Sequence, residues 1–186
     1  MTSKLLLVVS VVLVAAGAAR AGGGFDGPTI ADPANVPDFA LHDQNGRIVR
    51  LSSERGNVVL LTFMYTRCQG LCPLTATHLD SAALRVASPK VQVIAVTVDP
   101  RGDTSASVRR FVRTHALHAE FHYLTGPPAR LRAIWAAYHV STSHYGKHAY
   151  HTLYTMLIDR DGRGRVLYDS TATVDAISHD VKLVLR

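Results

Sequence analysis

The sequence predicts an α/β fold in which a central mixed β-sheet is flanked by helices. Two continuous apolar runs, 57–65 and 91–99, have the β-branched composition of strands that are buried on both faces. Segments with helical periodicity follow each run, so strands and helices alternate along the chain. The 186 residues suffice for one domain with a substantial core, and no internal repeat is present.

The N-terminal segment, residues 1–21, has the features of a secretory signal. Lys4 supplies a basic start, residues 5–19 are uncharged, and Ala19-Arg20-Ala21 offers an A-x-A cleavage site. The uncharged run is shorter than the roughly 20 residues that span a bilayer. We expect a cleaved signal peptide, with an uncleaved anchor as the alternative, and an exported domain in either case. Residues 22–36, rich in Gly, Pro, Asp and Asn, are expected to form a linker.

The folded domain, residues 37–186, is predicted to begin with a β-hairpin. Apolar residues flank Asn45-Gly46, a dipeptide that favours a tight two-residue turn. A short strand is expected at 121–124. A second hairpin is predicted over 151–169, where Asp161-Gly162 provides the turn.

Four helices are predicted from apolar periodicity and from residues typical of helix starts. Pro73 suits a first helical position, because the N–H that proline lacks has no partner there. The spacing of Leu74, His78, Ala82 and Val86 indicates that this helix continues to about residue 87. The other three are expected to begin at the caps Asp103 and Thr104, at the prolines of GPPARL (126–131), and near Thr173. The polar stretch 141–149 is expected to be a loop.

The composition excludes some classes of function. With 47% hydrophobic and 18% charged residues, the chain is typical of a folded globular protein. The net charge is +6, and without Lys4 and Arg20 of the leader it falls to a mild +4 (18 basic against 14 acidic residues). The basic residues are scattered rather than aligned, so no nucleic-acid partner is expected. A mildly basic surface does favour docking to an acidic partner.

The only two cysteines, Cys68 and Cys72, lie where the strand 57–65 gives way to a helix. In open α/β folds, functional sites form at this end of the strands. The helix N-terminus favours the thiolate form, and sulfurs four residues apart can form a disulfide or hold one soft metal ion. A disulfide across so short a loop would add little stability. We therefore predict a redox or metal role for the pair.

A third metal ligand is expected to be a histidine from another segment. Four of the ten histidines crowd one region: His139, His144, His148 and His151. His151 opens the strand predicted after the polar loop, so it can face a site at the sheet end. His148 is the weaker candidate, and the remaining histidines are expected to be solvated or structural.

Four segments in order resemble the Sco/SenC family. FMYTRCQGLCPLT (63–75) resembles its F-x-x-T-x-C-x-x-x-C-P signature, and VTVDPRGDT (96–104) and HTLYTMLIDRDGRG (151–164) resemble two further motifs. The hairpin FALHDQNGRIVRLS (39–52) is similar to the usual lead-in. The likeness covers about residues 37–185. It implies a thioredoxin-like sandwich and a copper-handling protein that assists cytochrome c oxidase assembly.

The resemblance implies that Cys68, Cys72 and His151 bind one copper ion per chain, with Asp99 close to the site. Two positions depart from the family pattern: Gln69 stands where many relatives have Pro, and Tyr150 where many have Asp. Neither is a ligand, so binding should survive, but the orientation of His151 is affected.

The implied function is a metallochaperone that delivers copper to the CuA centre of an oxidase subunit, rather than a classical enzyme. The alternative is a thiol–disulfide reductase that keeps that subunit's cysteines reduced, served by a thioredoxin-like reductant. A peroxiredoxin-type peroxidase is disfavoured because the stretch before Cys68 lacks the expected proline. A copper buffer using the histidines of 139–151 would bind several ions. The expected location is the periplasm, with membrane contact only through the N-terminal segment.

Overall fold

The structure, a computed structural model, describes residues 24–118, 120–145 and 148–186. The signal peptide predicted at 1–21 therefore lies outside the described residues. Within the described part, no helix combines the length and the apolar character needed to traverse a bilayer.

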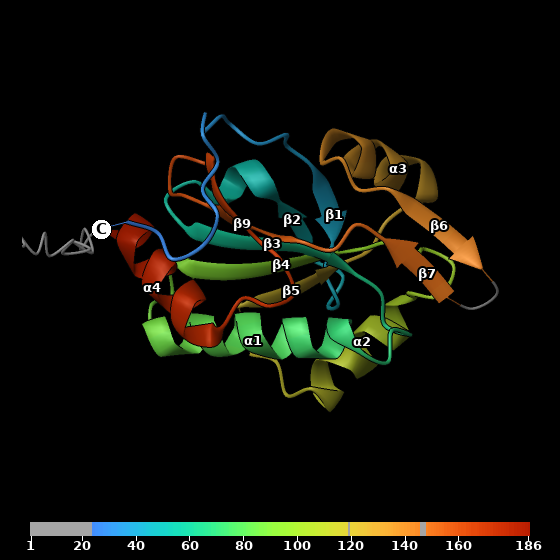
Figure 1. The fold of residues 1–186 in the computed structure, drawn as a ribbon. Helices are drawn as coiled ribbons and strands as arrows, with labels where there is room; N and C mark the ends of the chain where they lie inside the picture. The colour runs from blue at the N-terminus through green and yellow to red at the C-terminus, as the bar shows by residue number, and fades with distance from the viewer. Residues whose placement is uncertain (1–23, 119, 146–147) are drawn as a thin grey trace, which may run out of the picture.

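A five-stranded mixed sheet forms the centre of the domain (Figure 1). Its strand order is β5-β4-β3-β8-β9, with β3, β4 and β5 parallel and with β8 and β9 antiparallel to their neighbours. The strands are β3 (Val58–Met64), β4 (Val91–Thr97), β5 (Phe121–Leu124), β8 (Thr155–Ile158) and β9 (Gly164–Tyr168). Every residue of β3 is buried, as expected of a central strand that is covered on both faces.

Helices cover both faces of the sheet. In Figure 1, α1 (Leu71–Val86), α2 (Ser105–Thr114) and α4 (Val174–Leu185) lie below the sheet, whereas α3 (Pro128–Ala137) lies above it. The predicted N-terminal hairpin is present as β1 (Ala40–His42) and β2 (Ile48–Arg50), followed by a 3-10 turn, η1 (Leu51–Glu54). The predicted α/β sandwich with a mixed sheet and a leading hairpin is confirmed.

The predicted helix that starts near Pro73 is present as α1, and its buried face is lined mainly by small residues. Leu74 is 46% exposed, whereas the helix buries Cys72, Ala76, Leu79 and Ala82. The small residues at 72, 76 and 82 let the helix approach the sheet closely. The face that packs on the sheet is therefore set by close packing rather than by the largest apolar side chains.

The stretch 141–149 is not a loop. It contributes to an antiparallel hairpin outside the main sheet, formed by β6 (Thr142–Tyr145) and β7 (His148–His151), with Thr142 paired to His151. A two-stranded ribbon at the edge of a domain needs few apolar residues, so its composition resembles that of a loop. His151 therefore ends β7, and the next strand of the main sheet begins only at Thr155.

The stretch predicted to be a linker, 22–36, runs along the outer edge of β9 where it is described. Ile30 N–H donates to Arg165 O at 2.9 Å, and Leu167 N–H donates to Pro28 O at 3.0 Å. This pairing covers backbone groups that an edge strand would otherwise expose.

Candidate thiol and metal site

The cysteines lie at the carboxyl end of β3, in and after the turn that leads into α1. The backbone N–H of Cys68 donates to Tyr65 O at 3.3 Å, which tightens the turn. Cys68 is partly exposed, whereas Cys72, in the first turn of α1, is 1% exposed. Both cysteines are free thiols. The pair therefore presents one sulfur to the surface with the other behind it.

The surroundings of the two sulfurs give them opposite acidities. The Cys68 sulfur accepts hydrogen bonds from the Cys72 thiol and from the backbone N–H groups of Gly70 and Cys72, the last at 3.3 Å. These donors, the Cys72 thiol above all, lower the pKa of Cys68 to about 5. Donation to Cys68 and burial raise the pKa of Cys72. At neutral pH, Cys68 is a thiolate and Cys72 a neutral thiol.

His151 is half-buried at the end of β7, and its ring has a defined tautomer. Its Nδ1 lies 2.9 Å from Thr152 O. A carbonyl oxygen only accepts, so Nδ1 carries the hydrogen and Nε2 keeps its lone pair. Burial lowers the pKa of His151, which favours the neutral ring. The imidazole is thus prepared to donate a lone pair through Nε2.

Tyr65 links His151 to the cysteines. The Tyr65 and His151 rings pack edge to face with centroids 6.1 Å apart, and the negative charge of Cys68 partly offsets the effect of burial on the pKa of His151. Among the described residues, however, the two sulfurs and a ring nitrogen of His151 do not all lie within 4.8 Å of one another. The three predicted ligands therefore share one end of the sheet in an open arrangement. Gln69 and Tyr150, which depart from the family pattern, are both exposed.

Asp99 contacts Arg67, the residue before Cys68. It is 1% exposed, and its Oδ2 accepts from Arg67 Nε at 3.1 Å and from Arg67 Nη2 at 2.5 Å. Its Oδ1 accepts from the backbone N–H of Gly102 at 3.0 Å. A Cβ at Gly102 would collide with both side chains where they now lie, so a larger residue there would displace this pair. Asp99 ties the loop after β4 to the cysteine turn.

Asp103 is a site residue that the sequence did not reveal. Asp103 and Thr104 were both predicted to cap α2, and the N-cap is Thr104, whose Oγ1 accepts from Ser107 N–H at 3.1 Å. Asp103 is 4% exposed, and its oxygens accept from the N–H and hydroxyl of Thr66 at 2.9 and 2.6 Å. They also accept from Thr97 Oγ1 at 2.6 Å and from the Tyr123 hydroxyl at 3.0 Å. Through these hydrogen bonds, Asp103 fixes the cysteine turn to β4 and β5. Burial raises the pKa of Asp103.

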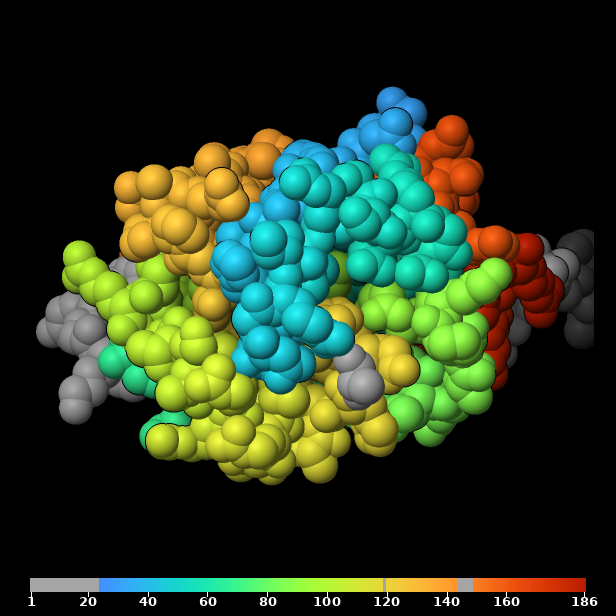
Figure 2. Space-filling model, turned by 180° about the vertical axis from the view of Figure 1, so that it is seen from behind, coloured from blue at the N-terminus to red at the C-terminus, as the bar shows by residue number. Residues whose placement is uncertain are grey.

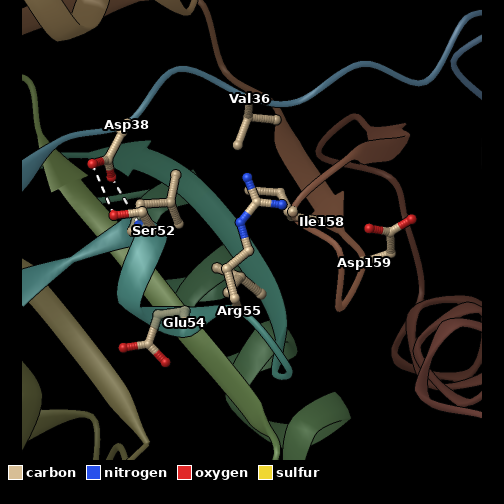
Figure 3. A pocket seen from close by; sticks show the side chains of 10 residues that line it. Val36, Asp38, Ser52, Glu54, Arg55, Ile158 and Asp159 are labelled. Atoms are coloured by element: carbon tan, nitrogen blue, oxygen red, sulfur yellow. Dashed lines mark hydrogen bonds between the residues drawn. The ribbon is translucent and has the colours of Figure 1, made fainter.

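Two other features of the described residues, a cluster of potential ligands and a small hollow, are separate from the candidate site. Asp26, His179 and Asp180 form a close group of potential ligands, but the Asp180 carboxylate already accepts from the N–H groups of Asp26 and Gly27 and from the Tyr168 hydroxyl. A hollow beside Asp38 and Arg55 has a volume of about 20 Å³, room for about one water molecule (Figure 3). None of the predicted ligands lines it.

Comparison with known proteins places the chain in a family. The model of the SCO1/SenC family matches residues 28–186. The SCO1 protein homolog of Bacillus subtilis is 31% identical over 105 residues, 54% of this chain and 54% of that protein. SCO2-like protein RC0895 of Rickettsia conorii is 27% identical over 135 residues, 68% of this chain and 65% of that protein. The chain thus spans between half and two thirds of these relatives.

Solved structures agree with this assignment. Bradyrhizobium japonicum ScoI with copper bound is 30% identical, with a TM-score of 0.72, covering 82% of this chain and 100% of that chain. Apo Sco1 from Thermus thermophilus is 32% identical, with a TM-score of 0.72, covering 88% and 97%. BsSco, whose structure is described as revealing a disulfide switch in a Sco cytochrome c oxidase assembly protein, is 26% identical with a TM-score of 0.69, covering 84% and 97%. The thioredoxin-like fold is confirmed, and this chain belongs to the SCO1/SenC family.

Proposed function

We propose that this protein binds one copper ion through Cys68, Cys72 and His151 and delivers it to the CuA centre of a cytochrome c oxidase subunit. The observation that carries this proposal is the arrangement of donors: a surface thiolate, a thiol directly behind it, and an imidazole with a free Nε2 at the same sheet end. The copper-bound ScoI of Bradyrhizobium japonicum supports the choice of metal.

The donor set suits a metal that must be held and then released. Thiolates are preferred by Cu(I), and an imidazole supports Cu(II). Three protein ligands leave one side of the ion open, so an acceptor's ligands can replace them one at a time. Cys72 is a neutral thiol, so copper binding must displace its proton, and affinity falls as the pH falls.

The same pair also favours thiol–disulfide exchange, the second candidate function. The Cys68 thiolate would attack a partner's disulfide, forming a mixed disulfide and releasing one partner thiolate. Cys72, after losing its proton, would then attack Cys68, releasing the second partner thiolate and leaving a Cys68–Cys72 disulfide. Two electrons pass to the partner, and an external dithiol, such as a thioredoxin-like protein, must restore the pair. An exposed low-pKa thiolate before a buried thiol is the arrangement this reaction needs.

Both functions belong in an oxidising compartment outside the cytosol. The sequence of residues 1–21 supports export, with the periplasm as the location and the inner membrane as the site of any tether.

The test is an absorption titration of the reduced protein with Cu(II). We expect thiolate-to-copper charge-transfer bands that saturate at one equivalent and are lost in Cys68→Ala and Cys72→Ala. His151→Ala should weaken binding by more than about tenfold, whereas His42→Ala, an exposed histidine on the N-terminal hairpin, should not change it. Unchanged affinity in His151→Ala would exclude that residue as a ligand and favour the reductase.

A further inference from the structure

A hollow of about 360 Å³ lies between three elements that meet beside the candidate site. Its lining comes from the loop after β4, from α3 and from β6: Pro100, Arg101, Pro128, Arg132, Trp135 and Thr142. We call it the arginine hollow. Seen from behind, α3 and the loop after β4 meet at one end of the molecule, coloured gold and yellow-green (Figure 2).

The arginine hollow adjoins the candidate ligands on two sides. Thr142 is the direct backbone partner of His151 in the β6–β7 hairpin. Pro100 follows Asp99, whose carboxylate holds Arg67, the residue before Cys68. A molecule seated in the hollow would therefore contact elements that also hold the cysteine turn and His151.

The floor of the arginine hollow is apolar and fixed. Trp135 is 6% exposed, and its indole N–H donates to Thr97 O at 3.0 Å, which ties the ring to the end of β4. Pro100 and Pro128 add rigid apolar surface on either side. The floor needs no rearrangement to receive an apolar group, so its side chains lose little conformational entropy on binding.

The walls of the arginine hollow carry positive charge. Arg101 and Arg132 are both exposed, and neither has an ion-pair partner among the described residues. Other described arginines, such as Arg110 and Arg113, also lack a carboxylate partner, so Arg101 and Arg132 are distinguished by their position in the wall of a hollow with an apolar floor. A guanidinium group pairs best with a carboxylate, often through two parallel hydrogen bonds.

The protein's own N-terminal segment does not supply such a group, because the first acidic residue of the chain is Asp26. Asp26 itself is held at α4. The overall charge of +6 also favours an acidic partner. Charge complementarity therefore points to another protein as the occupant.

We propose that the arginine hollow docks an acidic segment of the copper-accepting protein, with its carboxylates between Arg101 and Arg132 and an apolar neighbour on Trp135. This inference rests on the proposed function and adds the recognition surface to it. Docking there would orient the acceptor's metal-binding residues toward Cys68 and His151. It would act on the rate of transfer and leave the copper affinity of the free protein unchanged.

The first experiment uses Trp135, the chain's only tryptophan, as a reporter of occupancy. Two probe peptides are titrated into the copper-free protein: acetyl-Leu-Glu-Glu-Leu-amide and the matched acetyl-Leu-Gln-Gln-Leu-amide. We expect the glutamate peptide to change the Trp135 emission saturably and the glutamine peptide to have little effect. Added salt should weaken the response. Equal responses to both peptides, or none to either, would overturn the proposal.

The second experiment measures copper transfer from the loaded protein to the soluble CuA domain of the oxidase subunit from the same organism. The double variant R101E/R132E should bind copper normally but transfer it about tenfold more slowly. The control R110E/R113E makes the same charge change on α2, on the opposite face of the sheet, and should transfer at nearly the wild-type rate (Figure 1). R101Q/R132Q, the milder change, should give an intermediate rate.

The outcomes separate this inference from the proposed function. If the wild-type protein fails to bind copper through its cysteines, the proposed function fails, and the peptide titration still decides whether the hollow binds carboxylates. If copper binds but R101E/R132E and R110E/R113E transfer it at equal rates, the docking site is excluded and the metal site stands.

Discussion

Cys68 and Cys72 have the same side chain but opposite acidities because each is the other's main neighbour. The thiol of Cys72 stabilises the thiolate of Cys68 by donating to it, and the negative charge of Cys68 in turn keeps the proton on Cys72. A thiol at its ordinary pKa would be mostly protonated at neutral pH and would react slowly with electrophiles. The residue that carries the reactivity is therefore Cys68.

We predict that iodoacetamide modifies Cys68 of the reduced protein with a midpoint at about pH 5. The pKa of Cys68 is depressed, so the thiolate persists above that midpoint, and the rate falls as the pH falls through it. Mass spectrometry of peptides quenched at intervals gives the rate for each cysteine. Cys72 should remain unmodified across the same range.

The matched variants are Cys72→Ala and Cys72→Ser. Alanine removes the donor and should move the Cys68 midpoint toward the ordinary thiol value, whereas serine keeps a donor and should move it less. An unchanged midpoint in Cys72→Ala would show that the acidity of Cys68 comes from the backbone N–H groups instead.

At the residue scale, the sequence could nominate the candidate ligands but not the residues that hold them. Cysteine and histidine are common metal ligands, so Cys68, Cys72 and His151 could be predicted as ligands from residue type and position. Asp103 binds Thr66 across 37 positions, and Asp99 binds Arg67 across 32. A carboxylate's partner is set by the tertiary contact, so an aspartate near a helix start was naturally assigned to the cap.

At the scale of elements, the β6–β7 hairpin carries His151 but pairs with no strand of the main sheet. It is held at its base, where Thr152 N–H donates to Ser141 O at 3.1 Å and the Tyr154 hydroxyl donates to Tyr138 O at 2.6 Å. Coordination of a metal by the imidazole of His151, the last residue of β7, would therefore restrain the whole hairpin.

We predict that copper slows amide hydrogen exchange in β6 and β7 by about tenfold or more, because opening the hairpin then requires loss of a metal ligand. Exchange measured by mass spectrometry on the apo and loaded protein tests this, with α4 as the internal reference. In His151→Ala, copper should leave the hairpin unprotected. Equal protection in that variant would mean that the hairpin responds to the cysteines alone.

The buried elements were the easiest to predict. The strands β3 and β4 lie within two residues of their predicted bounds, because each follows a long and mostly apolar run. The β6–β7 hairpin was missed because its polar sequence, 141–149, lacks the apolar alternation by which a half-buried strand is recognised.

At the scale of the whole molecule, Asp180 joins the two ends of the described chain. It is fully buried in α4, and its oxygens accept from Asp26 N–H at 2.7 Å, from Gly27 N–H at 3.0 Å and from the Tyr168 hydroxyl at 3.0 Å. The segment that lies along β9 is thereby fastened at its start. Low apolar content made this segment resemble a free linker, and only the tertiary contacts show where it packs.

We predict that Asp180→Ala lowers the free energy of unfolding by about 1–3 kcal/mol, because buried donors lose their acceptor. Urea denaturation followed by circular dichroism measures the loss. Asp175→Ala on the same helix is the control: Asp175 is exposed and pairs with Arg85 on the surface, so its loss should cost well under 1 kcal/mol. Similar losses in the two variants would contradict this role for Asp180.

The N-terminal segment is anchored at α4, away from the end of α1 that carries Cys72. The Arg85–Asp175 pair places the start of α4 at the far end of α1 from Cys72, and α1 is about 24 Å long. The chain enters the fold beside α4, remote from the β6–β7 hairpin (Figure 1). A protein tethered to a bilayer through its leader would thus hold its copper-carrying tip away from the lipid, within reach of a partner domain that stands above the membrane.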